Sequence, residues 1–436
     1  REIGEQAAVS KNDISCISLY WDGAGGCILV FLQLCRARSV EIFDGPHQED
    51  FMKIYAKIVI SELLRILLFP MRICRIRKDR ILFTGLTGGT ANEYSCNPGY
   101  LCEYILEHYK GRYEIVWAVS DPEKYHFLED KGIRTVRHFS LSSFYWLMTS
   151  RVIVSNGSYA PWFPFRKQQY FINTWHGGGA YKKIENSAPG ANAATRYRAA
   201  FCAKNIKLFI STCHTATEKL IRGSFCYSGE VMECGMPRND CLVRGEIREA
   251  AEAVRKYYSL REDTGILLYA PTYRYSSRDI VLDCDRLAEV LREDGRDWVI
   301  LYRAHRYQDD RMKIRVTGSC VRNASGYPDM QQLLAAADMM ITDYSSNIWD
   351  YSFLYRPCFL YVPDLEEYLQ KTGFYVDIRK WPFPMAEDRE QLYSLIRSFD
   401  REQNRIAIDE HHRMMGCTES GHACEQIAER IAEVCG

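Results

Sequence analysis

The sequence predicts an α/β protein with two doubly wound domains that face a cleft. From Arg80 onward, short apolar runs alternate with helical stretches, which is typical of parallel sheets covered by helices. A polar, helical stretch near 245–262 divides this alternation into two series, and each series predicts one sheet. The 436 residues amount to about three common domain sizes, so the chain can bury more than one core.

Apolar runs mark the expected strands. The first series predicts strands at Ile81–Thr84, Glu114–Val119, Val152–Ser155, Tyr170–Thr174, Leu208–Ser211 and Val231–Glu233. The second series predicts strands at Ile266–Tyr269, Trp298–Tyr302, Met339–Thr342 and Cys358–Tyr361. Among the helices between them, we expect one capped by Asn97 with Pro98 in its first turn, and one amphipathic helix from Leu333.

These patterns divide the chain into five segments. Residues 1–50 have no readable role, although 14–43 are compatible with a small β-hairpin. Residues 51–80 form an amphipathic basic segment, 81–250 a first Rossmann-like domain and 251–415 a second one. Residues 416–436 are expected to form a C-terminal helix that crosses back and ties the two domains together.

The charge balance excludes one class of partner and conceals a local excess. Lys+Arg and Asp+Glu number 56 each, so the chain has no overall basic field for nucleic acid. By position, however, residues 1–52 carry a net charge of −4, residues 53–80 carry +6 and the remainder carries −2. The positive excess therefore lies in one short stretch.

That stretch has the pattern of a helix at a membrane surface. Residues 51–73 are mostly apolar, but Lys53, Lys57, Ser61 and Arg65 recur every four residues and form one polar stripe. Pro70 ends or kinks the helix, and the segment is too short and too polar to span a bilayer. A wide apolar face followed by basic residues suits a helix lying on anionic lipid. Packing of the helix onto the protein body or a partner subunit is the alternative.

The cysteines indicate a reducing compartment. The 17 cysteines are scattered, no C-x-x-C pair occurs, and no signal-peptide pattern opens the sequence. The His/Cys spacing of a structural zinc site is also missing. We therefore expect a cytoplasmic protein with reduced cysteines and infer no metal, although a loosely bound divalent ion stays compatible with the sequence.

The first chemical motif is Asn173-Thr-Trp-His-Gly-Gly-Gly-Ala-Tyr-Lys-Lys, directly after an expected strand. Ligands bind at the carboxyl ends of parallel strands, and glycines such as Gly177 and Gly178 let a bulky group approach the backbone. His176 is therefore a candidate general base, and Lys182 and Lys183 are candidates to neutralise phosphate. A glycine turn with a structural histidine is the alternative.

The second motif is Ile341-Thr-Asp-Tyr-Ser-Ser-Asn-Ile-Trp-Asp. It predicts a buried strand, an acidic turn residue, Asp343, and then hydroxyls at the start of a helix whose first N–H groups are unpaired. Ser345 and Ser346 can bind a phosphate oxygen there together with the helix amides. Simple helix capping by Asp343 or Ser345 is the alternative.

Basic residues after other apolar runs can converge on the same cleft. They are Arg238, Arg274, and Arg303 with His305. Arginine forks bind two phosphate oxygens at once, although a single arginine is more often a surface charge. No G-x-x-x-x-G-K-[ST] loop and no G-x-S-x-G elbow occur, which argues against a P-loop NTPase and an ordinary serine esterase.

Six motifs together resemble one known family. In chain order they are Trp175-His-Gly with the following Lys-Lys, Gly235-Met-Pro-Arg-Asn-Asp, Ala270-Pro-Thr-Tyr-Arg, Tyr327-Pro-Asp, Ile341-Thr-Asp-Tyr-Ser-Ser and Tyr361-Val-Pro-Asp-Leu-Glu-Glu-Tyr. Over residues 80–432 the chain resembles the CDP-glycerol glycerophosphotransferase family of teichoic-acid primases and polymerases. The resemblance implies a GT-B fold and transfer of a polyol phosphate from CDP-glycerol or CDP-ribitol to a lipid-linked acceptor.

The resemblance also implies roles for individual residues. His176 corresponds to the base that activates the acceptor hydroxyl, and Arg303 and His305 correspond to donor-phosphate contacts. Asp343, Ser345 and Ser346 resemble the pyrophosphate-binding turn. The first domain would then be the acceptor side and the second the donor side. A threonine commonly follows His-Gly in the family, where this chain has Gly178, which leaves its acceptor specificity open.

The resemblance further implies peripheral attachment to the cytoplasmic membrane face, which favours the membrane interpretation of residues 51–80. It leaves open the polyol, the acceptor lipid, a homo-oligomer, and whether one unit or a polymer is added. Two other functions remain. A GT-B nucleotide-sugar glycosyltransferase would have the same cleft and histidine base, and a non-catalytic lipid- or nucleotide-binding subunit would need no base.

Overall fold

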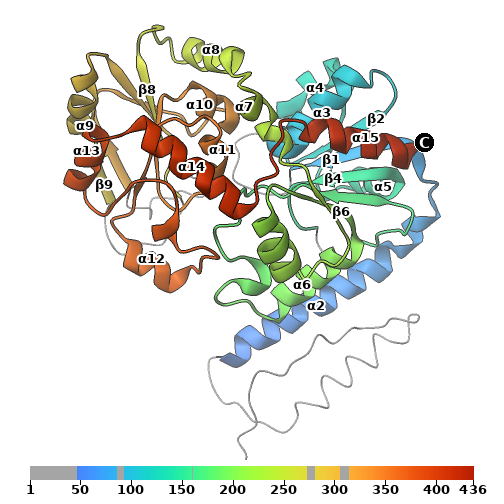
Figure 1. Ribbon diagram of the computed structural model, residues 1–436. Coiled ribbons are helices and arrows are strands. Elements are labelled where there is room, and N and C mark those ends of the chain that lie inside the picture. Colours follow the sequence, from blue (N-terminus) through green and yellow to red (C-terminus); the bar gives the residue numbers. More distant parts are fainter. Residues whose placement is uncertain (1–46, 86–92, 160, 273–279, 305–313) are drawn as a thin grey trace, which may run out of the picture. The chain divides into compact units, whose positions relative to one another are not determined.

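The computed structural model describes residues 47–85, 93–159, 161–272, 280–304 and 314–436. The chain divides into two compact units, residues 1–54 and 55–436. The first unit lies almost wholly outside the described residues, including the expected hairpin at 14–43. The second unit contains both predicted series of strands (Figure 1).

A seven-stranded parallel sheet forms the first half of this unit. Its strand order is β3-β2-β1-β4-β5-β6-β7, so the direction of winding reverses between β1 and β4. Alternate residues of a strand face opposite sides: Ile81 and Phe83 of β1 pack on one face, and Leu82 packs on the other. The strands are β1 Arg77–Thr84, β2 Glu114–Val119, β3 Arg134–Arg137, β4 Ser150–Ser155, β5 Tyr170–Asn173, β6 Ile206–Ser211 and β7 Glu230–Glu233.

A six-stranded parallel sheet forms the second half. Its order is β12-β10-β8-β13-β14-β15, with the reversal between β8 and β13. Strands β9 and β11 form a separate parallel pair, and they alternate along the chain with strands of this sheet. The strands are β8 Gly265–Tyr269, β9 Ile280–Asp283, β10 Trp298–Tyr302, β11 Ile314–Thr317, β12 Val321–Asn323, β13 Met339–Thr342, β14 Cys358–Tyr361 and β15 Met385–Ala386.

Helices cover both sheets. The α-helices are α2 His47–Leu68, α3 Cys96–His108, α4 Phe127–Asp130, α5 Leu141–Thr149, α6 Ala193–Asn205, α7 Asp240–Arg244, α8 Arg248–Tyr257, α9 Cys284–Leu291, α10 Met330–Ala336, α11 Asn347–Ser352, α12 Leu365–Lys371, α13 Arg389–Arg397, α14 Arg401–Met415 and α15 Ala423–Cys435. Single turns of 3₁₀-helix include η1 Phe69–Ile73 and η5 Pro237–Asn239, and η4 Ala216–Ser224 is a π-helical turn.

Three apolar clusters hold the layers together. One packs α3 and α15 on a face of the first sheet, and another packs α9 and α13 on a face of the second. The third runs without interruption from α5 and α6 of the first half to α10 and α11 of the second, for example from Met148 and Phe201 to Leu334 and Ile348. Because this third cluster contains side chains from both halves, the two halves share part of one core. Burial of each such side chain contributes about 1.5–3 kcal/mol to the free energy of folding.

The structure confirms the α/β class with parallel sheets and all ten expected strands, within two residues at most ends. It adds β3, β9, β11, β12 and β15, which the sequence pattern did not reveal. The predicted cap was wrong. Helix α3 begins at Cys96 with Ser95 as its N-cap residue, and Asn97 is a fully buried residue of the first turn.

Helix α2 ends where Pro70 predicted, and its polar side faces the protein. Tyr197 of α6 donates a hydrogen bond to Glu62, and the Arg65 guanidinium lies 5.8 Å from the Phe201 ring centroid. Several large apolar residues of α2 and η1 point away from the protein: Leu67 is 72% exposed and Ile73 is 92% exposed, whereas Met71 packs against the core. Within the described part of the chain, no helix has the length and apolar content that a bilayer crossing requires.

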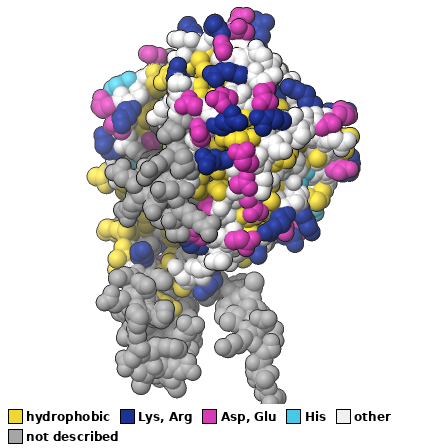
Figure 2. All heavy atoms as spheres, turned by 90° about the vertical axis from the view of Figure 1, so that its left-hand side faces the viewer, with side chains coloured by type: hydrophobic (Ala, Val, Ile, Leu, Met, Phe, Trp, Pro, Cys, Tyr) yellow, Lys and Arg dark blue, Asp and Glu magenta, His cyan; other side chains and the backbone are white. Residues whose placement is uncertain are grey.

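Charged side chains of both signs are interspersed on the face that carries α9, α13 and α14 (Figure 2). Several form exposed pairs, such as Arg397 with Glu293 at 2.7 Å and Arg286 with Glu289 at 2.6 Å. This face therefore presents no broad field of one sign, in agreement with the balanced composition. Each cysteine that the structure describes is a free thiol.

Candidate active site

The loop after β5 carries His176 in a strained, well-anchored turn. Trp175 has φ +50°, a conformation that costs free energy for any residue other than glycine. Its backbone N–H donates to the Asn173 side-chain oxygen at 2.8 Å, and its carbonyl accepts from the Asn97 amide at 2.9 Å. These bonds offset the strain and fix the direction in which His176 leaves the sheet.

The ring of His176 is oriented as a proton acceptor. Its Nδ1 lies 2.8 Å from the carbonyl oxygen of Asn156, which follows β4. A carbonyl only accepts, so Nδ1 carries the hydrogen and Nε2 is left with the lone pair. Burial, with a smaller contribution from the Arg238 charge, lowers the pKa of His176 to about 4. The ring is therefore neutral at physiological pH.

Two of the three glycines after His176, Gly178 and Gly179, are required by their neighbours. A Cβ on Gly178 would lie 2.3 Å from the Trp349 ring, and one on Gly179 would lie 2.4 Å from the Tyr181 ring. Gly179 also has φ +69°. Gly177 has more room, with the Ser346 hydroxyl oxygen 3.6 Å from its Cβ position. The His176 loop and the Ser345–Ser346 turn, each predicted from sequence, thus face each other across the two halves.

The turn after β13 lies at the reversal point of the second sheet. Both carboxylate oxygens of Asp343 accept from the Thr272 backbone N–H at 2.9 Å, which joins the ends of β8 and β13. The Ser345 hydroxyl oxygen accepts from the Asn347 N–H at 3.3 Å, and Ser346 makes no side-chain cap bond. Asp343 thereby shapes the turn, and Ser346 faces the glycine loop. Helix α11 has only six residues, so a bound phosphate would depend more on hydroxyls and cations than on a helix dipole.

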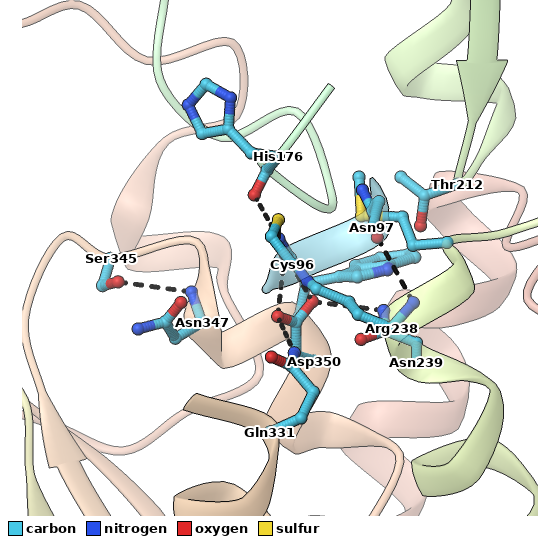
Figure 3. A network of polar contacts seen from close by, with 12 residues as sticks. Cys96, Asn97, His176, Thr212, Arg238, Asn239, Gln331, Ser345, Asn347 and Asp350 are labelled. Carbon is cyan, nitrogen blue, oxygen red and sulfur yellow. Dashed lines mark hydrogen bonds and ion pairs between the residues drawn. The ribbon is translucent and has the colours of Figure 1, made fainter. Parts of the chain in front are cut away.

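Arg238 lies at the centre of a buried polar network (Figure 3). Its guanidinium pairs with Asp350 of α11 at 2.8 Å and donates from Nη1 to the His176 carbonyl oxygen at 2.7 Å and to Cys96 Sγ at 3.1 Å. The sequence suggested a phosphate contact for Arg238. In the structure its charge is paired with Asp350, and it contacts the catalytic candidate through the backbone.

The remaining basic candidates of the second series are Arg303, Arg274 and His305. Arg303 is partly buried, and its Nη1 donates to the carbonyls of Ala324 and Tyr327 at 3.1 and 2.8 Å. Arg274 and His305 lie outside the described residues, so their predicted roles stay predictions.

Lys182 and Lys183 join the glycine loop to the segment after α12. Lys182 forms an isolated antiparallel bridge with Phe374, and its ammonium lies 5.7 Å from the Tyr368 ring centroid. The Lys183 N–H donates to the Gly373 carbonyl at 2.8 Å. Both lysines thus contact the second half of the unit.

Asp350 and Glu419 had not been singled out from the sequence, and Asn97 had been expected only as a helix cap. Asp350 accepts from Asn239 at 3.1 Å and from Gln331 at 2.9 Å, and Asn97 bonds to Arg238 and to the loop before His176. Asp350 had one signal, since it is a lone charge in the apolar run of α11. Glu419, in the segment between α14 and α15, had none. Among the described residues, no group of three or more His, Cys, Asp or Glu side chains is arranged to hold a metal ion.

Comparison with a protein-family model shows the family of this chain. The model for CDP-glycerol:poly(glycerophosphate) glycerophosphotransferases matches residues 67–433, which is most of the chain and includes both sheets. The chain belongs to this family. Its six sequence motifs therefore have a common origin, and the geometry around His176 can be considered as that of a glycerophosphotransferase family member.

Three curated relatives are similar to this chain over most of its length. The teichoic acid poly(glycerol phosphate) polymerase of Bacillus subtilis is 27% identical over 82% of the chain, and the chain spans only 49% of that relative's length. The polymerase of the same description from Bacillus spizizenii is 26% identical over 85% of the chain and 97% of its own length. The teichoic acid glycerol-phosphate transferase of Staphylococcus aureus is 25% identical over 81% of the chain and 93% of its own length.

A solved structure of the glycerophosphotransferase family has the same fold. The wall teichoic acid polymerase TagF superposes with a TM-score of 0.71 at 24% identity, covering 90% of this chain and 99% of the TagF chain. At this identity the likeness establishes the arrangement of sheets and helices. Roles of individual residues have to be argued from the contacts described above.

Proposed function

We propose that this chain transfers glycerol phosphate, or a related polyol phosphate, from a CDP-polyol to a hydroxyl of a lipid-linked acceptor and releases CMP. The relatives named above act in teichoic acid synthesis, and one TagF structure was obtained after soaking with the donor abbreviated CDPG. The decisive observation in this chain is the His176 ring, whose Nδ1–H is bound to the Asn156 carbonyl so that Nε2 is left as a base.

The proposed reaction needs no covalent enzyme intermediate. Nε2 of His176 takes the proton of the acceptor hydroxyl, and the oxygen attacks the β-phosphorus of the donor in line. The new P–O bond forms as the bond to the CMP oxygen breaks, and CMP leaves with the electron pair. Since Gly177 faces the Ser346 hydroxyl, the reacting phosphate would lie between the glycine loop and the turn after β13.

The donor side of the proposal combines hydroxyls and cations from the second sheet. Ser345 and Ser346 would bind phosphate oxygens in a turn whose shape Asp343 maintains. Arg303, and by resemblance His305 and Arg274, would supply positive charge to the pyrophosphate. Gly177, Gly178, Lys182 and Lys183 would border the acceptor side. Arg238 would act by holding the His176 carbonyl.

The proposal places the protein at the cytoplasmic face of a membrane, attached through α2 and the basic residues that follow it. The support is the orientation of this helix. Its polar residues Glu62 and Arg65 contact α6, and large apolar residues such as Leu63 and Leu67 are exposed. The basic residues Arg72, Arg75 and Lys78 follow the helix in the sequence. An outward apolar stripe with neighbouring cations suits an anionic lipid surface. A lipid-linked acceptor would be met there.

The decisive experiment measures CMP release. The protein is incubated with a lipid-linked acceptor and, in separate reactions, CDP-glycerol, CDP-ribitol and UDP-sugars. We expect CMP from a CDP-polyol and no turnover of UDP-sugars. Release of UDP instead would identify a glycosyltransferase, and binding of a donor without any turnover would identify a non-catalytic subunit.

A pair of histidine variants tests the base. His176→Ala should lower kcat by about 10²–10⁴-fold, while donor binding survives. His126→Ala is the matched control, because His126 is exposed and contacts Glu123 at 3.0 Å on the surface of the first half. Full activity of the His176 variant would contradict the proposed base.

A further inference from the structure

Glu419 lies partly buried where the two halves of the protein meet, and it belongs to none of the sequence motifs. It belongs to the segment between α14 and α15, and its carboxylate accepts four hydrogen bonds. Three donors come from the first half: the Thr212 hydroxyl, the Met236 backbone N–H at 2.9 Å and the Asn239 amide at 3.0 Å. The fourth is the Trp349 indole N–H of α11 in the second half, at 3.1 Å.

Trp349 transmits this contact to the loop that carries His176. The indole ring lies directly against the backbone of Gly178 and Gly179, since a Cβ on either residue would be within 2.9 Å of ring or Cβ atoms of Trp349. Trp349 is itself fully buried. The hydrogen bond from its indole to Glu419 fixes how the ring is turned, and the ring in turn sets the position of the glycine backbone.

A second connection runs through the turn at η5. Glu419 bonds to Met236 and Asn239 on either side of Arg238, and Asn239 also bonds to Asp350 at 3.1 Å. Arg238 donates to the His176 carbonyl oxygen at 2.7 Å. Arg238 therefore holds the loop at His176, and Trp349 holds it at Gly178 and Gly179. Glu419 contacts Trp349 and the two residues Met236 and Asn239 near Arg238.

We propose that Glu419 is a positioning residue for the transfer reaction: it holds Trp349 and the Arg238 turn so that His176 faces the turn after β13. This inference rests on the proposed function, because it concerns the base of that reaction. Glu419 touches no reacting atom. Its effect on the rate passes through the placement of His176 and Gly177, and a displacement of about 1 Å can cost about 10²-fold in rate.

The chemistry of the site favours a carboxylate. All four partners are donors, and a carboxylate has only acceptor sites. Glutamine has the same shape, but its NH₂ group would face at least one N–H or O–H donor and lose that bond. Glu419→Gln therefore disturbs the contacts with little change in volume. Trp349→Phe removes the indole N–H contact, together with part of the buried ring, and keeps an aromatic side chain at this position.

The experiment compares kcat and KM with CDP-glycerol and a lipid-linked acceptor. We expect Glu419→Gln and Trp349→Phe each to lower kcat about 10- to 100-fold, with the donor KM changed less than threefold. In the double variant, the two losses should not add in full, because Glu419 and Trp349 are in direct contact and support the same glycine loop. Trp298→Phe is the matched control. Trp298 is the first residue of β10, and its indole N–H donates to the carboxylate of Asp294 at 3.1 Å. This variant should keep kcat.

The outcomes separate this inference from the proposed function. If wild-type protein releases no CMP, the proposed function fails. If wild type is active and Glu419→Gln keeps kcat while its melting temperature falls, Glu419 is only structural and the inference is overturned. Equal losses in Trp298→Phe and Trp349→Phe would overturn it as well. Should Glu419→Gln fail to fold, Trp349→Phe with its control decides the question.

Discussion

At the scale of single residues, the most informative feature is how the environment of His176 sets its basicity. Burial and the nearby Arg238 lower the pKa of His176 to about 4, which makes it a weak base in the free protein. A pyrophosphate bound beside Gly177 would bring negative charge close to the ring and raise that pKa. The base would then become stronger when the donor is bound, which is when it is needed.

Because the pKa of His176 should rise when the donor binds, we expect different pH profiles for kcat/KM and for kcat. The profile of kcat/KM reports the free enzyme, so it should show no His176-dependent fall between pH 8 and pH 5 and should decline only toward pH 4. The profile of kcat reports the complex, and its acidic limb should lie at higher pH. Steady-state rates with CDP-glycerol from pH 5 to 8 test this, with Glu419→Gln measured in parallel to separate that carboxyl. A kcat/KM inflection near 6.5, the ordinary histidine value, would contradict it.

Gly178 gives a second residue-scale prediction. In Gly178→Ala the new Cβ would lie 2.3 Å from the Trp349 ring, so the ring or the loop has to move. We expect a loss of about 1–3 kcal/mol in the free energy of unfolding, typical of overpacking, together with reduced kcat. Urea unfolding and CMP release measure both. Gly326→Ala is the control, because nothing lies within 4 Å of its Cβ position and its φ is ordinary. Equal stability of the two variants would sink the steric argument.

The sequence predicted the site residues that follow buried strands and missed those that act through contacts between distant segments. His176, Asp343 and Ser346 follow buried strands, and strand ends meet at one edge of a parallel sheet. Asp350, Asn239 and Glu419 act through contacts between segments 70 to 180 residues apart. No local pattern encodes such partners. For the same reason, the sequence could not reveal that Arg238 pairs with Asp350.

At the scale of elements, the sequence predicted best where burial is complete. Inner strands such as β4, β8 and β13 are buried along nearly their whole length, so they appear as apolar runs. The edge strands β3 and β12 are polar, with Arg134, Arg137 and Arg322 exposed or nearly so, and their pattern resembles a loop. Asn97 looks like a helix cap in sequence, but its amide is used to bind the His176 loop.

Helix α2 carries the element-scale prediction. If its outward apolar stripe lies on lipid, Leu63→Glu with Leu67→Glu should abolish flotation with vesicles that contain anionic lipid. These side chains are 61% and 72% exposed, so folding should be preserved. Activity on a soluble acceptor analogue should also persist, because the helix contacts α6 through Glu62 and Arg65.

The control for α2 changes an exposed apolar residue elsewhere. Ile406→Glu on α14 alters a side chain that is 43% exposed and should leave flotation intact. Unchanged flotation of the Leu63 and Leu67 double variant would show that α2 does not bind lipid. High salt should weaken wild-type binding, since the cations that follow the helix would be screened from the headgroups.

At the scale of the whole molecule, buried ionisable groups join the two halves and make stability depend on pH. The histidines His176, His411 and His412 have pKa values lowered by burial to about 4. Between pH 4 and 6.5 the unfolded chain binds protons that the folded protein excludes. Their contribution therefore raises stability as pH increases through this window and is complete above 6.5.

Glu419 acts in the opposite direction, which gives the last prediction. Burial raises its pKa from 4.5 to about 7, although its hydrogen bonds oppose the shift. Between these values the folded protein keeps a proton that the unfolded chain has released. Stability from this group is thus complete below pH 4.5 and is lost as pH rises through 7, by about 3 kcal/mol in total.

Urea unfolding of wild type and Glu419→Gln at pH 5, 6, 7 and 8 isolates this contribution, because the histidine contributions are common to both proteins. The free-energy difference between them should change by about 2–3 kcal/mol from pH 5 to pH 8, with wild type losing stability relative to the variant. A constant difference would mean that the carboxyl is ionised throughout. In that case the hydrogen bonds from Thr212, Met236, Asn239 and Trp349 would stabilise the negative charge of Glu419 by more than burial destabilises it.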